Sequence, residues 1–229
     1  MTATARLHFA DAGEAADLAA FLARLIHYDK AAAVRLQAAG DTLAVFGRPP
    51  SFEVLAIRTA RLATPYGHGV DATLDVTVSA GEFLESVGES ARPGAAAGAA
   101  VPGAVTGPPW AGVLPPRGGW RQEPGLPDPA VVRELVRVAV GEFRSRVEQL
   151  PAERRVRAEL DRVGREIWSR TIGDTQLPVR AAHAAQSLGF LRGDTLTLLS
   201  SGAWLRLRTA YGSVAVRRGG VQGLSVTPA

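Results

Sequence analysis

The chain contains no cysteine and no asparagine, and Lys30 is its single lysine. The absence of cysteine excludes disulfide bonds, thiolate metal ligands and cysteine nucleophiles. Alanine, glycine, proline and arginine are abundant instead, which is typical of a protein encoded by a GC-rich genome. Arginine content by itself therefore says little about function.

No apolar run reaches the roughly 18 residues that a membrane-spanning helix requires. Residues 1–6 also lack the charged start and apolar centre of a secretion signal. The sequence therefore predicts a cytoplasmic protein without a membrane partner. Its 229 residues are enough for one substantial core or two small ones.

Charge is unevenly distributed along the chain. Residues 1–127 carry ten basic and twelve acidic side chains, a net charge of −2. Residues 128–229 carry sixteen basic and ten acidic side chains, a net charge of +6. If a polyanion is bound, we expect it to contact the C-terminal part.

A short sequence echo links the two ends of the chain. Gly-Asp-Thr-Leu occurs at residues 40–43 and again at 193–196. Each copy is followed by a hydrophobic residue and Arg-Thr-Ala, at 57–60 and 207–210. Each copy predicts a turn, a strand, a second turn and a return strand. The echo indicates one β-rich unit used twice.

Hydrophobic periodicity and capping signals place helices and strands along both halves. The predicted helices are 11–26, 79–87, 128–150, 152–172 and 178–188, and the predicted strands are 6–9, 34–38, 42–46, 52–62, 74–78, 195–199, 203–209 and 213–217. This pattern predicts an α+β fold with a mainly antiparallel β-sheet core, a strand-helix-strand unit and a helical hairpin. We expect the strands of both halves to join one sheet system. The predicted domains are an N-terminal α+β half at 1–87, a linker at 88–127, and the hairpin followed by a C-terminal β-meander at 128–229.

The predicted linker has an unusual composition. Glycine, proline and alanine fill 25 of its 40 positions, without hydrophobic periodicity, which predicts a flexible segment. Trp110 and Trp120 lie within it beside pairs of prolines. Either they form a motif that docks into a partner's groove, or they fold back onto the chain's own surface.

The β-rich segments resemble a known family. Residues 34–45 form a strand-turn-strand pattern, and residues 74–87 run from a strand directly into a short helix. Together with the hairpin at 196–207, these patterns resemble the repeat of bacterial DNA sliding clamps over about residues 5–88 and 193–218. The resemblance implies a fold in which a strand, a helix and three strands repeat. It also implies a role accessory to DNA metabolism.

The sequence offers few residues for catalysis. None of the four histidines has the spacing of a metal site, and no glycine cluster has the context of a nucleotide loop. His68 and Asp71 are the best candidates for a reactive loop, without a recognisable third partner. We therefore expect no metal, no cofactor and no enzymatic activity, with a hydrolase as a distant third hypothesis.

One predicted strand suggests a binding surface. Leu205 and Leu207 are expected to face the core, so the residues that alternate with them share the other face. An aromatic side chain beside arginines suits contact with a protein or with nucleic acid. The predicted binding residues are Trp204, Arg206, Arg208 and Arg217.

These observations favour a non-enzymatic cytoplasmic binding or scaffold protein with a clamp-like core and a protein partner. The alternative is a winged-helix-like DNA-binding protein that acts through residues 178–218. A homo-oligomer remains open.

Overall fold

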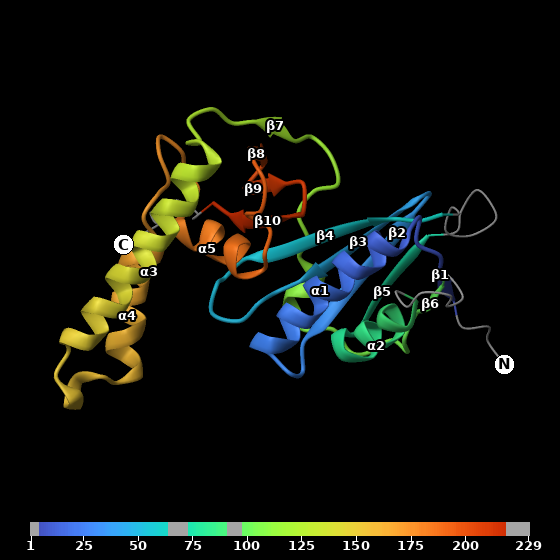
Figure 1. Ribbon diagram of the computed structural model, residues 1–229, viewed down its shortest axis with the longest axis horizontal. Coiled ribbons are helices and arrows are strands. Elements are labelled where there is room, and N and C mark those ends of the chain that lie inside the picture. Colours follow the sequence, from blue (N-terminus) through green and yellow to red (C-terminus); the bar gives the residue numbers. More distant parts are fainter. Residues whose placement is uncertain (1–4, 64–72, 91–97, 219–229) are drawn as a thin grey trace, which may run out of the picture.

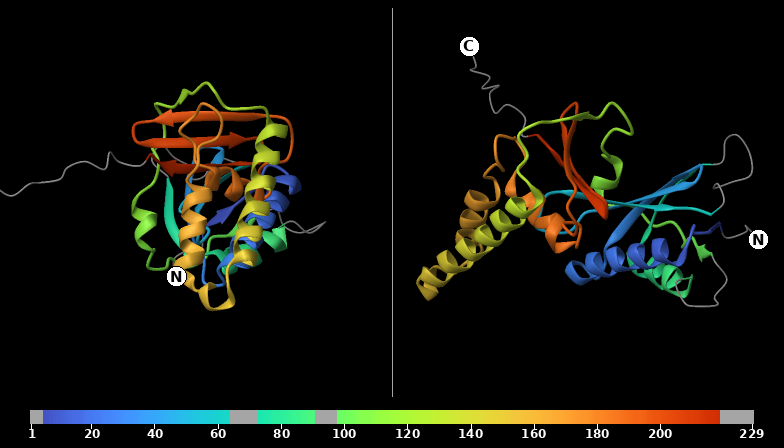
Figure 2. Two further views of the ribbon diagram at one scale, coloured as in Figure 1. Left: turned by 90° about the vertical axis from the view of Figure 1, so that its left-hand side faces the viewer. Right: turned by 45° about the horizontal axis from the view of Figure 1, so that its top comes forward.

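The computed structural model describes residues 5–63, 73–90 and 98–218 (Figure 1). A large sheet is covered on one face by helices, and a hairpin of two helices extends from the body (Figures 1 and 2). The helices are α1 (Ala12–Tyr28), α2 (Ala80–Ser90), α3 (Pro129–Gln149), α4 (Arg157–Trp168) and α5 (Val179–Ser187), with short 3-10 helices η1 (Pro109–Gly112) and η2 (Ala152–Arg154). The strands are β1 (Arg6–Leu7), β2 (Ala33–Ala39), β3 (Thr42–Gly47), β4 (Leu55–Arg61), β5 (Leu74–Ser79), β6 (Ala99–Ala100), β7 (Arg121–Gln122), β8 (Leu196–Ser201), β9 (Trp204–Thr209) and β10 (Gly212–Arg217).

The two halves of the chain share one antiparallel sheet of eight strands. Its order is β5-β2-β3-β4-β10-β9-β8-β7, so the N-terminal strands lie side by side at one end and the C-terminal strands at the other. They join where β4 pairs with β10, through Ile57↔Ser213, Ala56↔Val214 and Leu55↔Ala215. The predicted α+β class and the single sheet system are confirmed.

The main core lies between the helices and the inner face of the sheet. The side chain of Asp11 accepts a hydrogen bond from the Glu14 backbone N–H at 3.0 Å and caps the start of α1. The apolar stripe of this helix then packs on the strands below it. Its buried members are Ala15, Leu18, Phe21, Leu22 and Leu25.

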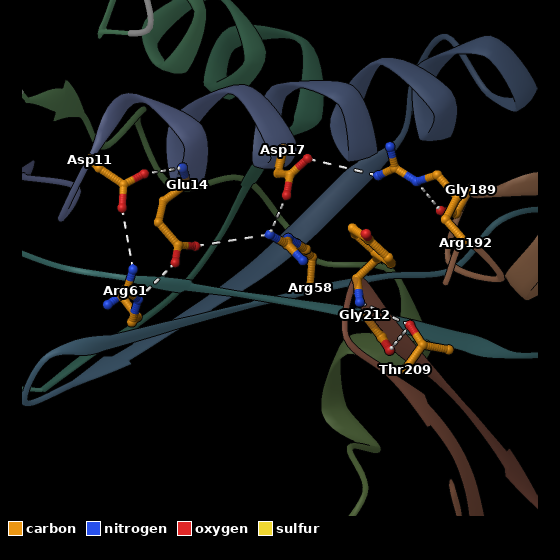
Figure 3. A network of polar contacts seen from close by, with 10 residues as sticks. Asp11, Glu14, Asp17, Arg58, Arg61, Gly189, Arg192, Thr209 and Gly212 are labelled. Atoms are coloured by element: carbon orange, nitrogen blue, oxygen red, sulfur yellow. Dashed lines mark hydrogen bonds and ion pairs between the residues drawn. The ribbon is translucent and has the colours of Figure 1, made fainter. Parts of the chain in front are cut away.

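A network of ion pairs fastens α1 to the sheet (Figure 3). Arg58 of β4 is almost fully buried, and its guanidinium lies 3.0 Å from the carboxylate of Asp17 and 3.9 Å from that of Glu14. Arg192, which lies between α5 and β8, approaches Asp17 at 3.8 Å. The helix is therefore tied to both halves of the chain.

The expected flexible linker at 88–127 is wrong for most of its length. Helix α2 continues to Ser90, and residues 98–127 are ordered, with Ala99, Val101 and Ala111 buried. Small apolar side chains pack closely here, and backbone groups pair with neighbouring strands, so order does not require hydrophobic periodicity. The part of the predicted linker at 91–97 lies outside the described residues.

Residues 104–120, named here the strap, cross the outer face of the sheet, which is the face turned away from α1, α2 and α5 (Figure 2). At one edge the Val105 N–H donates to the Thr77 carbonyl of β5 at 2.9 Å. On the next strand, the Arg35 guanidinium of β2 donates to the Ala111 carbonyl. At the other edge the chain enters β7, which pairs with β8. The strap therefore spans the sheet from edge to edge.

Two other predicted elements differ in extent. Strand β4 begins at Leu55 instead of residue 52, because Ser51 and Glu53 adopt positive φ angles of 69° and 53° that no strand accommodates. The predicted helix 152–172 is divided into η2 and the shorter α4.

Candidate binding face

The four predicted binding residues lie together on the outer face of β9 and β10. Trp204 pairs with Arg217 in the strand register, while Arg206 and Arg208 face the same way along β9. The alternating residues Leu205, Leu207, Val214 and Val216 are buried on the inner face. The set Trp204, Arg206, Arg208 and Arg217 is named here the arginine face.

Arg206 is the most unusual member of the arginine face. Its guanidinium is half-buried and its Nε donates to the Ser213 hydroxyl at 2.8 Å. Burial lowers the pKa of Arg206, and the positive charge of Arg208 lowers it further. Among the described residues no carboxylate forms an ion pair with it. Arg206 is thus a partly desolvated cation without a counterion in this part of the chain.

The two other arginines of this face are exposed and likewise form no ion pair within the described ranges. The Arg217 guanidinium lies 5.8 Å from the centre of the Trp204 ring, within the range of a cation–π contact. Arg208 and Arg217 therefore make the outer face positively charged at β9 and β10.

A small second core occupies the middle of the outer face. Its buried members Phe46, Leu55, Ile57 and Ala215 come from β3, β4 and β10. Trp110 and Leu114 of the strap pack against it, as does Trp204. The strap is therefore anchored by apolar contacts in addition to its hydrogen bonds.

A groove of about 230 Å³ lies between the strap and the sheet. Pro115, Pro116 and Arg117 form its strap side, and Arg206 lines it from β9. The sheet contributes Gln37, Ala38, Ala39, Thr42, Ala44, Phe46, Ile57 and Thr59. The groove therefore has an apolar floor, and beside this floor lies the Arg206 guanidinium, which has no ion-pair partner among the described residues.

The strap meets the arginine face, which the sequence pattern does not reveal. The Arg206 guanidinium lies 5.7 Å from the centre of the Trp120 ring, and the Trp120 indole N–H donates to the Pro116 carbonyl at 3.0 Å. Trp110 and Trp120 therefore both contact the chain's own surface. The available signal was the stiff Pro115-Pro116 pair just before Trp120, which restricts where that ring can lie.

The arrangement around α5 does not match a winged helix. A recognition helix needs an exposed face, but Gln186 is the single exposed residue of α5. The buried residues of this helix are Val179, Ala181, Ala182, Ala184 and Ala185. Strand β10 is moreover paired with β4 and is not part of a free wing. The expectation of a winged-helix-like DNA-binding unit at 178–218 is therefore wrong in its geometry.

The candidate residues for catalysis are one histidine-aspartate pair and the side chains that could bind a metal ion. His68 and Asp71 lie outside the described residues. Within 5–63, 73–90 and 98–218, no three histidine, aspartate or glutamate side chains are grouped as metal ligands would be. In the same ranges, none of the helices combines the length and apolar character needed to span a bilayer.

Comparisons with known proteins divide the chain at the strap. Residues 2–112 match the family described as "Domain of unknown function (DUF8010)", and residues 115–221 match "Domain of unknown function (DUF8185)". No curated protein matches the sequence.

Among solved structures, the chain is similar to the DNA polymerase sliding clamp from Pseudomonas aeruginosa, solved with a ligand, with a TM-score of 0.45 and 13% sequence identity. The match covers 91% of this chain and 63% of the clamp chain. The weak resemblance to bacterial sliding clamps that the sequence suggested is thus found again among solved structures, and it stays a weak resemblance.

Proposed function

We propose that this chain is a non-enzymatic binding protein whose arginine face and adjoining groove hold an acidic segment of a partner protein. The observation that supports this most is the half-buried Arg206 guanidinium, which has no ion-pair partner among the described residues. A desolvated cation is costly alone and favourable when a carboxylate reaches it. A bound acidic side chain would supply that carboxylate.

The groove favours a peptide over a nucleic acid. Its floor contains Phe46, Ile57 and Ala44, which suit an apolar side chain. The carboxylate of Asp75, which accepts a hydrogen bond from Gln37 at 3.0 Å, is already paired with Arg35 at 2.7 Å and so does not compensate the Arg206 charge. Hydrogen bonding from Arg35 lowers the pKa of Asp75, so this carboxylate stays ionised at neutral pH.

A labelled peptide of alternating glutamate and leucine tests the proposal, with single-stranded DNA as the competing probe. We expect Arg206→Gln to weaken peptide binding about tenfold or more, because a hydrogen bond to a charged group contributes about 1.5–3 kcal/mol. Arg121→Gln is the matched control. Arg121 is exposed and unpaired among the described residues, and its register with Ser200 places it on the opposite face.

Two results would overturn the proposal. Equal peptide affinity for the Arg206 and Arg121 variants would remove the arginine face from binding. Binding of DNA alone, with a steep loss between about 50 and 200 mM salt, would instead identify the surface as a phosphate contact.

A further inference from the structure

A second cavity lies away from the groove, where the helical hairpin meets the loop before β4. This cleft has a volume of about 640 Å³, within the range of roughly 300–1,000 Å³ that is typical of small-molecule sites. Phe143 lines it from α3, and Leu160, Gly164 and Trp168 line it from α4. Arg180 of α5 closes its base. Elements from both halves of the chain therefore form one concave surface.

Aromatic rings form the apolar wall of this hairpin cleft. The Phe143 and Trp168 rings lie 5.7 Å apart, and Trp168 stacks on His183 with 4.5 Å between ring centres. A Cβ atom on Gly164 would lie 3.3 Å from the indole Cδ1. Glycine at this position thus allows the indole to lie close against its own helix. The wall suits a flat, apolar group.

The opposite rim is held by a strained loop. Phe52 packs against His183 with 5.1 Å between ring centres. The residues on either side of it, Ser51 and Glu53, have the positive φ angles already described and both line the cleft. Such backbone conformations persist only where the surroundings fix them. The rim is therefore fixed by the inserted ring.

Hydrogen-bond donors without partners gather in the cleft. Arg165 is exposed and forms no ion pair with the described residues. Arg180 has only Glu53 near it, at 3.9 Å, and its Nε is buried without a hydrogen-bond partner in the described ranges. The Trp168 indole N–H also finds no acceptor there. Asp161 offers little compensation, because Arg157 already contacts it at 3.2 Å.

We propose that the hairpin cleft binds a small organic anion with a flat heteroaromatic part, of the size and chemistry of a nucleoside monophosphate. The heteroaromatic ring packs against Trp168, Phe143 and Leu160. The anionic group receives hydrogen bonds from Arg165 and Arg180, which guanidinium groups donate to phosphate in a paired geometry. This site is independent of the arginine face and of the partner proposed for it.

Isothermal titration with AMP, adenosine and inorganic phosphate tests this assignment on the full chain. We expect AMP to bind more tightly than either of the other two probes, because it alone satisfies both the aromatic wall and the arginines. Arg165→Gln should weaken AMP binding about tenfold. Leu160→Trp should abolish it by filling the cleft, while leaving the peptide affinity of the arginine face unchanged.

Arg144→Gln is the matched control, since Arg144 is an exposed arginine of the same hairpin that does not line the cleft. Absence of AMP binding at millimolar concentration would overturn the proposal. AMP affinity that survives both Arg165→Gln and Leu160→Trp would do the same, because the ligand would then lie elsewhere. Equal affinity for phosphate and AMP would refute the heteroaromatic part of the assignment.

Discussion

Removal of the Trp110 side chain tests whether the strap is part of the folded structure. A fully buried tryptophan costs about 3–5 kcal/mol when it is cut to alanine. Trp110 is only half-buried against Phe46, Leu55 and Ile57, so about half that cost, roughly 1.5–2.5 kcal/mol, is expected. For a chain of this length, 1 kcal/mol lowers the melting temperature by about 2–4 °C. We therefore expect Trp110→Ala to lower the melting temperature by about 3–10 °C.

Differential scanning calorimetry measures this shift directly. Val113→Ala serves as the control, because Val113 belongs to the same strap but is 49% exposed. Its substitution should change the free energy of unfolding by less than about 0.5 kcal/mol. Limited proteolysis gives a second readout, since loss of the anchor should expose the strap to cleavage. If Trp110→Ala has the same melting temperature and the same protease resistance as the wild-type protein, the strap does not stabilise the sheet and the prediction is refuted.

Two further predictions concern buried groups. Burial lowers the pKa of His183 below its ordinary value of 6.5. The unfolded chain therefore binds a proton before the folded chain does, and the free energy of unfolding should fall as the pH drops through about 6.5. His183→Phe should flatten this fall in urea titrations across that pH range, and an unchanged slope would contradict the prediction. Gly212→Ala should cost about 1–3 kcal/mol, because the added Cβ would lie 2.6 Å from the buried Phe190 ring. Gly202→Ala controls for the backbone conformation, because Gly202 also has a positive φ angle, of 53°, but open space around it. It should cost less in the same denaturation assay, and equal losses would refute the steric explanation.

The strands and most helices could be predicted because their signals are local. Leu18, Phe21, Leu22 and Leu25 repeat with the helical period, and the alternation around Leu205 fixes which side chains share a face. Those local patterns placed the arginine face correctly in the structure, although its function stays a prediction. The joining of both halves into one sheet also followed, because neither strand set alone has enough helices to cover it.

The strap and the groove could not be predicted in the same way. Trp110 is ordered by Phe46 and Ile57, which are distant in the sequence, and Arg206 meets Trp120 only because the strap crosses the whole sheet. Such long-range contacts produce no hydrophobic periodicity in a segment that consists mostly of glycine, proline and alanine. The hairpin cleft was missed for a related reason. Its rim depends on Phe52 and on the positive φ angles of Ser51 and Glu53, neither of which is glycine.

The short pairing of β4 with β10 has a mechanical consequence. Three residue pairs connect the halves there, whereas β3 and β4 share six. Apart from the two-pair contact of β7 with β8 at the sheet edge, this junction is the shortest pairing in the sheet, and it is the only strand pairing between the halves in the described part of the chain. The groove is lined by Phe46 and Ile57 from one half and by Arg206 from the other. A molecule bound in the groove as proposed would therefore contact both halves across their junction and add to the three residue pairs that join them.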